Sequence, residues 1–534
     1  MSRSRAPATA AEHAAFHAPH NPWLIAVVAT IATFMEVLDT SIANVSLPHI
    51  AGNLGASVTD STWVLTSYLL ANAIVLPATA WLSSAIGRTN YYMLSVALFS
   101  AASLLCGVAP NLGLLVACRV LQGLAGGGLQ PMTQAIMIDT FPPHQRGMGM
   151  AVYGMTVVVA PVVGPTLGGW ITDNYSWRWV FLINVPIGIV ALWLSARYLS
   201  DPPFLRRRTG QSRWRVDFAG LSLLAIGLGA MQLVLDLGER EDWFASPWIQ
   251  GAAWLAVITL LGGIWWAFRH PDPIVNLRVL RDRNLGLSCL HMLVFGAVLF
   301  ASTALLPLMM QTLLGYTAQL SGMALSPGGM VIAVMMPLVG WLVTRVDARW
   351  MVLTGIVIIA VALLQFAALS LTVDLRTLVL VRMLQGLGLA FVFVPINTIA
   401  YASISPAARN DASSLMSIAR NIGGSIGIAY AGTMVARGGQ THRAQLVEHC
   451  SIYDPHYQAA AAAVRDRLLA GGADPAPAEL VSHAVLDQLV NRQASMLSYL
   501  DQFRFQALAF LVLVPIVLLM RRRTAPTHVE LVGE

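Results

Sequence analysis

The chain has 534 residues, of which 56% are hydrophobic and only 11% are charged, and its mean hydropathy is +0.66. Soluble domains carry roughly a quarter charged residues, so this composition excludes an ordinary soluble protein. The net charge is +6 and every cationic side chain is an arginine. The absence of lysine excludes an ATPase phosphate-binding loop and a Schiff-base enzyme, because both need a lysine amine.

Apolar runs near the ~20 residues that cross a bilayer recur along the chain. Lipid forces each run to be helical, because a helix satisfies its own backbone hydrogen bonds. We therefore predict an all-α integral membrane protein with about fourteen transmembrane helices. The expected spans start near Trp23, Thr62, Tyr91, Leu112, Gly147, Trp177, Phe218, Trp248, Leu287, Leu320, Trp350, Thr377, Ala412 and Phe505.

The arginines predict the orientation. They concentrate in alternate connections, most densely between residues 197 and 215 and at the end of the last span, whereas short loops near Pro110 and Asp374 hold few. This is the positive-inside pattern, so both termini are expected in the cytoplasm of an inner-membrane protein. The basic charge is thus explained by topology, and no nucleic-acid partner is expected.

Cysteines and histidines form no recognisable site. Cys106, Cys118, Cys289 and Cys450 show no paired spacing, and the twelve histidines form no ligand pattern. We expect no disulfide, no metal and no cofactor, and no enzymatic activity. The first apolar run is too long for a cleaved signal peptide.

The two halves of the chain match at a constant offset of 263 residues. Arg119-Val-Leu-Gln-Gly-Leu124 recurs as Arg382-Met-Leu-Gln-Gly-Leu387, and Arg146 and Gly164 recur as Arg409 and Gly427. We predict two homologous six-helix bundles with a substrate site between them, working by alternating access.

The expected division has five parts. They are a cytoplasmic tail (1–21), an N-terminal six-helix bundle (22–200), a linker with two inserted helices (201–284), a C-terminal bundle (285–521) and a second tail (522–534). An outer loop at about 437–503 interrupts the C-terminal bundle and contains two helix-like stretches, 459–470 and 479–500. It is either a passive loop or a docking surface for an external partner.

The first span carries two carboxylates. Glu36 and Asp39 lie one turn apart, and ionised carboxylates in a membrane helix must pair or face a wet cavity. The segment Leu38-Asp-Thr-Ser-Ile-Ala-Asn-Val-Ser-Leu-Pro48 resembles the first-helix signature of EmrB/QacA-type fourteen-span drug:proton antiporters, within the major facilitator superfamily. We expect Asp39 and Glu36 to exchange protons; the alternative is that one of them accepts a structural hydrogen bond.

The fourth span contains a buried arginine. The segment from Leu115 to Gly123, with Arg119 and Gln122, is similar to the superfamily motif on that helix, and the resemblance implies a part for Arg119 in proton coupling. Because arginine keeps its proton, its part is electrostatic, unless it is purely structural. Further cavity candidates are Asn44, Gln122, Arg382, Gln385 and Arg420; the roles of Glu36, Arg382 and Arg420 stay open.

The fifth span is rich in glycine and proline and resembles the antiporter motif of drug exporters. Glycines four residues apart allow a neighbouring helix to approach, and the prolines favour bending. We expect a gate formed by Gly154, Pro161, Gly164, Pro165, Gly168 and Gly169.

One motif departs from the superfamily pattern. In the segment from Ala80 to Arg88, only the final Gly87 and Arg88 remain, and Ser84 and Ala85 replace the usual Asp and Arg. A cytoplasmic gate is therefore expected to depend on Gly87, Arg88, Asp139 and Arg146.

These features together predict a proton-coupled exporter of hydrophobic or cationic compounds. An uptake transporter of the same fold and a membrane enzyme or sensor are the alternatives. The long outer loop resembles that of the EmrB-like branch, which implies a periplasmic adaptor and an outer-membrane channel as partners. The sequence identifies neither the drugs, nor the proton stoichiometry, nor the oligomeric state, nor the adaptor.

Overall fold

The computed structural model describes residues 20–142, 145–201, 217–271, 273–405, 408–448, 450–451, 453–472 and 474–521, and all regular elements in these ranges are helical. The first part contains α2 (Pro22–Leu54), α3 (Val58–Ser61), α4 (Trp63–Val75), α5 (Thr79–Ile86), α6 (Arg88–Val108), α7 (Leu112–Gly126), α8 (Leu129–Thr140), α9 (Arg146–Asn174), α10 (Trp179–Leu182) and α11 (Asn184–Tyr198). The remainder contains α12 (Phe218–Leu237), α13 (Pro247–Arg269), α14 (Arg283–Thr312), α15 (Ala318–Leu342), α16 (Ala348–Phe366), α17 (Leu375–Ala400), α18 (Arg409–Glu448), α19 (Pro455–Ala470), α20 (Pro475–Leu511) and α21 (Leu513–Leu518).

The membrane-spanning architecture is confirmed. Among the described residues, 13 helical segments are long and apolar enough to cross a membrane. Helix α18 is too polar to be counted with them, yet it packs along α14 and α20. It corresponds to the span expected near Ala412. The protein is therefore a multi-pass, all-α membrane protein with the expected set of about fourteen spans.

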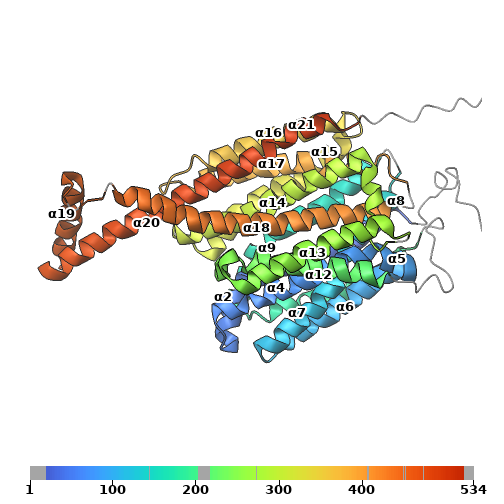
Figure 1. The fold of residues 1–534 in the computed structure, drawn as a ribbon, viewed down its shortest axis with the longest axis horizontal. Helices are drawn as coiled ribbons and strands as arrows, with labels where there is room; N and C mark the ends of the chain where they lie inside the picture. The colour runs from blue at the N-terminus through green and yellow to red at the C-terminus, as the bar shows by residue number, and fades with distance from the viewer. Residues whose placement is uncertain are drawn as a thin grey trace, which may run out of the picture.

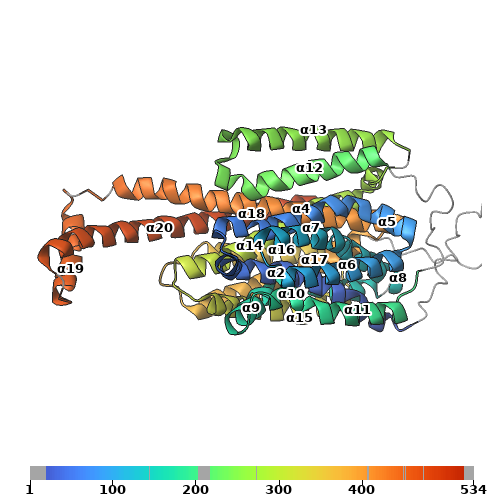
Figure 2. The same ribbon diagram turned by 90° about the horizontal axis from the view of Figure 1, so that it is seen from below.

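Packing divides the helices into two sets. Helix α2 packs against α8, α9 and α11, and α7 packs against α4 and α6; later in the chain, α14 packs on α18 and α17 lies between α15 and α16. The sets meet mainly along α9 and α15 and where α8 touches α18. The α12–α13 hairpin lies on the outside, with α12 against α4 and α18 (Figure 2). The domain boundaries given above stay predictions.

One hydrogen bond joins repeat-related residues. The Gln134 amide donates to the side-chain oxygen of Asn397 at 2.6 Å, and the two residues are 263 positions apart, which is the offset of the repeat. Gln134 lies on α8 and Asn397 on α17, and both are buried. Residues related by a twofold axis can touch only close to that axis, so this contact marks where the two halves meet.

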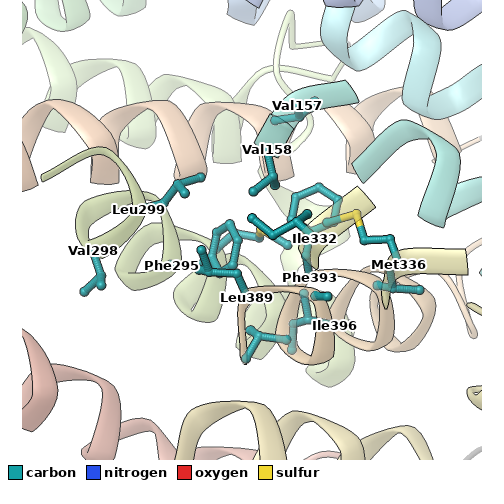
Figure 3. Close-up of a cluster of buried hydrophobic side chains, with 14 of the residues drawn as sticks. Val157, Val158, Phe295, Val298, Leu299, Ile332, Met336, Leu389, Phe393 and Ile396 are labelled. Carbon is teal, nitrogen blue, oxygen red and sulfur yellow. The ribbon is translucent and has the colours of Figure 1, made fainter. Parts of the chain in front are cut away.

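Apolar side chains fill the space between the two sets of helices. Val158 of α9 points toward Phe295 and Ile332 of the later helices, and Val157 and Phe393 belong to the same buried cluster (Figure 3). The rings of Phe295 and Phe393 are 5.5 Å apart. The Phe393 ring also lies 6.1 Å from the ring of Tyr153, which accepts a hydrogen bond from Arg420, so this layer adjoins the polar residues described below.

Helices α14 and α18 touch backbone to backbone. A Cβ atom on Gly423 would overlap the carbonyl oxygen of Leu293, and one on Gly427 would overlap that of Ala297. A Cβ on Gly296 would likewise overlap the backbone of Arg420. Such small-residue contacts hold membrane helices at short range, so the two helices form one unit.

The outer segment differs from the loop expected at 437–503. Helix α18 continues to Glu448, and α20 runs without a break from Pro475 into the last span, because no glycine or proline separates the stretch ending at Leu500 from Phe505. Both helices project beyond the bundle and carry α19 at their far end (Figure 1). His442 of α18 lies 2.8 Å from Asp501 of α20. The segment is therefore a continuation of two spans.

Candidate functional site

A buried ion pair joins the first and fourth spans. The Arg119 guanidinium lies 2.5 Å from the Asp39 carboxylate, and both side chains are 0% exposed. The other Asp39 oxygen accepts from Gln122 at 3.0 Å and from Asn184 at 2.7 Å. Arg119 also donates to the carbonyl of Val64 at 2.9 Å. Asp39 therefore has a donor on each oxygen, which offsets the cost of burying its charge.

Aromatic rings cover the Arg119 guanidinium. Its carbon lies 4.2 Å from the centre of the Tyr68 ring and 5.5 Å from that of Phe181. One terminal nitrogen, Nη2, is buried without a hydrogen-bond partner among the described residues. Since arginine does not lose its proton, the pair changes state only if Asp39 takes up a proton or another group displaces it.

Glu36 belongs to a second polar cluster that reaches the other half of the chain. One carboxylate oxygen accepts from Tyr68 at 3.0 Å and from Asn72 at 3.3 Å. The other accepts from the Gln130 amide at 2.7 Å, and the Gln130 oxygen in turn accepts from Arg420 of α18. The two acidic residues of α2 thus have different surroundings: Asp39 lies within the first set of helices, and Glu36 lies where the two sets meet.

Arg382 is the repeat counterpart of Arg119, but the hydrogen-bond partners of its side chain are neutral. It donates to Gln385 at 2.5 Å and to Thr303 at 3.3 Å, and Gln385 donates to Ser302 at 3.2 Å. Arg382 and Gln385 are buried against their neighbours, and their assignment to a cavity stays a prediction. Asn44, by contrast, has an exposed side chain and lies outside both acidic clusters.

Glycines of α9 lie against two different helices, α2 and α17. Gly164 and Gly168 lie against Ser41 and Ile42 of α2, whereas a Cβ on Gly154 would come within 2.5 Å of Phe393 on α17. A Cβ on Gly169 would meet no atom within 4 Å.

Pro165 explains one further contact of this helix. A proline has no N–H, so the carbonyl four residues earlier, that of Pro161, loses its helical donor. Ser41 of α2 donates to this carbonyl at 3.0 Å. This hydrogen bond joins the proline-containing part of α9 to the helix that carries both acids.

A third cluster lies where α5, α6, α8 and α18 meet. Asp139 lies 2.6 Å from Arg88 and also accepts from Arg409 of the second half, while Arg88 donates to Asn410 at 2.7 Å. Gly87 joins α5 to α6 with φ = +99°, a conformation that favours glycine. Arg146 donates to the Ile138 carbonyl at 3.2 Å. The residue that reaches Asp139 across the halves is therefore Arg409, the repeat counterpart of the expected Arg146.

Sequence reasoning missed several partners, namely Gln130, Tyr68, Asn72, Asn184 and Tyr153. Each is a polar residue in an apolar run, which is a usable signal, but nothing in the sequence says which of them point inward. Among the described residues, no group of three or more His, Cys, Asp or Glu side chains could hold a metal ion.

Comparison with known proteins decides the family. Residues 29–428 match the model of the Major Facilitator Superfamily. The chain belongs to this superfamily. It is 37% identical to the multidrug export protein EmrB of Escherichia coli K12, over 82% of this chain and 84% of that one. It is 35% identical to the fatty acid resistance protein FarB of Neisseria gonorrhoeae, over 92% of this chain and 94% of that one.

A solved structure supports the same fold. The human organic anion transporter MFSD10 superposes with a TM-score of 0.57 at 14% identity, covering 92% of this chain and 100% of that one. This similarity concerns the fold alone. The superfamily membership predicted from the motifs of the first, fourth and fifth spans is confirmed.

Proposed function

We propose that this superfamily member is a proton-coupled exporter of hydrophobic or cationic toxic compounds, acting by alternating access in the inner membrane with both termini in the cytoplasm. The observation that carries the proposal is the buried Asp39–Arg119 pair. A membrane protein that keeps a desolvated carboxylate beside a permanent cation has a group whose protonation changes the local charge by one unit. The relatives named for multidrug export and fatty acid resistance support hydrophobic substrates and the outward direction.

Alternating access is supported by the two regions where the halves meet. At one end, Arg409 reaches Asp139, and near the centre Arg420 reaches Gln130. Contacts of this kind can break and reform as one set of helices rocks against the other. The apolar layer between the halves is packed closed here; when the halves separate, it would offer hydrophobic compounds a surface that needs no fixed pattern of hydrogen bonds.

Transport into inverted membrane vesicles tests the function. The vesicles are energised by respiration, a fluorescent probe reports their internal pH, and hydrophobic cations or fatty acids are added. An exporter releases protons from the vesicles when substrate is added, and an uncoupler abolishes substrate accumulation. Substrate-independent pH traces, or accumulation that survives the uncoupler, would contradict the proposal; proton flow in the opposite direction would indicate an uptake system.

The projecting part of α18, α19 and α20 is proposed to bind a periplasmic adaptor that leads to an outer-membrane channel. A hydrogen bond between His442 and Asp501 and an ion pair between Arg443 and Asp487 join α18 to α20 in this extension, so it offers a preformed surface. The test is to replace residues 449–474 by a short Gly-Ser linker, which leaves both contacts in place. Loss of adaptor co-purification with unchanged yield of the pump supports the docking role, and unchanged capture contradicts it.

A further inference from the structure

The position of Gln130 is the starting point. It is the one side chain that bonds both to Glu36 of α2 and to Arg420 of α18 among the contacts of the described residues. Glu36 and Arg420 are each only 2% exposed. Because α2 and α18 belong to different sets of helices, this glutamine closes a polar bridge across the interface.

The orientation of the Gln130 amide is forced by chemistry. Arg420 can only donate, so the Gln130 oxygen must face it and the NH₂ group must face Glu36. That arrangement requires a Glu36 oxygen that accepts, which an ionised carboxylate provides. The bridge therefore has a direction: guanidinium to amide oxygen, then amide nitrogen to carboxylate.

Protonation of Glu36 conflicts with this direction. The first Glu36 oxygen already accepts from Tyr68 and Asn72, and a proton there would require the Tyr68 hydroxyl to turn over and accept. A proton on the oxygen that faces Gln130 leaves both of these bonds in place. Two donors then meet. If the amide turns over to accept the new O–H, its NH₂ group faces the Arg420 guanidinium, and again two donors meet. With the proton on this oxygen, no orientation of Gln130 satisfies both neighbours.

We infer that Gln130 is a positioning residue that converts protonation of Glu36 into release of Arg420, and so opens the central contact between the two halves. The inference rests on the proposed proton coupling, but it concerns a different step. Arg420 also donates to Tyr153 of α9 at 3.2 Å, and its Nε is buried without a partner among the described residues. Loss of the Gln130 oxygen would leave this buried cation poorly satisfied, which favours rearrangement.

The other ionisable groups around Glu36 do not supply a competing bridge. Tyr68 of α4 donates to it, Arg119 of α7 lies behind the Tyr68 ring, and Asp39 lies one turn further along α2. Tyr153 of α9 contacts Arg420, not Glu36. Of the charged groups, only Arg420 belongs to the opposite half.

The chain supplies a matched control on the same helix. Gln134 lies one turn from Gln130 on α8 and also crosses the interface, but its partner is the neutral Asn397. Methionine has nearly the volume of glutamine and neither donates nor accepts strongly. Gln130→Met and Gln134→Met therefore each remove a crossing hydrogen bond, and only the first removes one that depends on an acid.

The test measures the distance between the halves as a function of pH. Spin labels are placed at Asn90→Cys on α6 and Trp350→Cys on α16, both exposed, in the full chain with its four native cysteines replaced by alanine. Distance distributions are recorded in nanodiscs between pH 8 and pH 5, without substrate or gradient. We expect the distance distribution of the parent protein to shift as the pH falls. Gln130→Met should lose at least half of that shift, whereas Gln134→Met should keep it.

Two Arg420 variants test the direction of the bridge. Lysine also only donates, so Arg420→Lys is expected to keep the acid-induced shift. Glutamine can donate or accept, so Arg420→Gln can bond to Gln130 in either orientation and is expected to hold the high-pH distribution at pH 5. Three outcomes would each overturn the inference. They are an unchanged acid-induced shift of the distance distribution in Gln130→Met, an equal loss of that shift in both methionine variants, and a full shift in Arg420→Gln. Since no transport is measured, its failure is distinguishable from failure of the proposed function in the vesicle assay.

Discussion

Ser302 occupies in the second half of the chain the position that Asp39 occupies in the first. The two residues are one repeat offset apart, and each accepts a hydrogen bond from the glutamine that follows its arginine by three positions. Arg119 consequently has a carboxylate partner, whereas Arg382 donates to neutral oxygens. The second half has the arginine and the glutamine, with a serine at the position of the acid.

This asymmetry predicts opposite effects of the same substitution. Arg119→Met leaves Asp39 buried and unpaired, which costs about 3–5 kcal/mol in comparable cases. Arg382→Met removes a buried charge that has no carboxylate beside it and should leave stability unchanged or raise it. Thermal unfolding of the purified protein in detergent measures both. Equal losses of Tm in the two variants would contradict the conclusion that only Arg119 is paired with a carboxylate.

Asp39→Asn is expected to separate binding from coupling. The amide is similar in size and can still accept from Gln122 or Asn184, but it neither carries charge nor exchanges a proton. We expect proton release on substrate addition to disappear in inverted vesicles, and equilibrium substrate binding to change less than tenfold. Full proton-driven efflux in this variant would show that Asp39 is not the coupling acid.

The cluster around Asp139 should control opening at its end of the molecule. Arg409→Ala removes the ion pair with Asp139 that crosses between the halves, beside the remaining Arg88–Asn410 bond, whereas Arg146→Ala removes a bond to the carbonyl of Ile138. Ser83 is buried and accepts a hydrogen bond from Asn410 of this cluster, and we expect a cysteine placed there to react several-fold faster with a water-soluble maleimide in Arg409→Ala. The matched Arg146→Ala variant should react at close to the parent rate, and the same acceleration in both would argue against a specific lock.

Two glycines of α9 provide a paired test of helix packing. In Gly164→Ala the new methyl group would overlap Ser41 of α2, and overpacking of this kind costs about 1–3 kcal/mol. In Gly169→Ala it would meet nothing within 4 Å. Thermal stability and efflux should fall in the first variant and stay near parent values in the second. A loss confined to Gly169→Ala would mean that the helix packs differently.

Much of the architecture could be predicted from the sequence because lipid constrains it. Long apolar runs must be helices, and α18 was recognised among them although its hydropathy is low. The repeat offset and the motifs around Asp39, Arg119 and Gly164 indicated the superfamily. The extent of α20 was missed because a polar helix that leaves the membrane resembles a separate loop in composition.

The residues of the candidate site could be predicted from the sequence only in part. Two acids in one apolar span are conspicuous, since each is costly there. Their partners are not, because Asn184 and Gln130 look like any isolated amide until the helices are packed. Likewise, Arg146 and Arg409 are equivalent in the repeat, and only the three-dimensional arrangement shows that Arg409 is the one that reaches Asp139.

Helix α20 has one mechanical consequence. It is a single rigid rod of 37 residues that begins outside the bundle and ends among the packed helices of the second half. Arg492 donates to the carbonyl of Leu313, so the helix contacts the second half from there on. At about 1.5 Å per residue, the ~17 residues before Arg492 form a lever arm of roughly 25 Å, so a tilt of about 10° at its base would move the tip by about 4 Å. A partner bound to that tip would be displaced whenever the helix tilts during a conformational change of the second half. The motion would be transmitted by the helix itself.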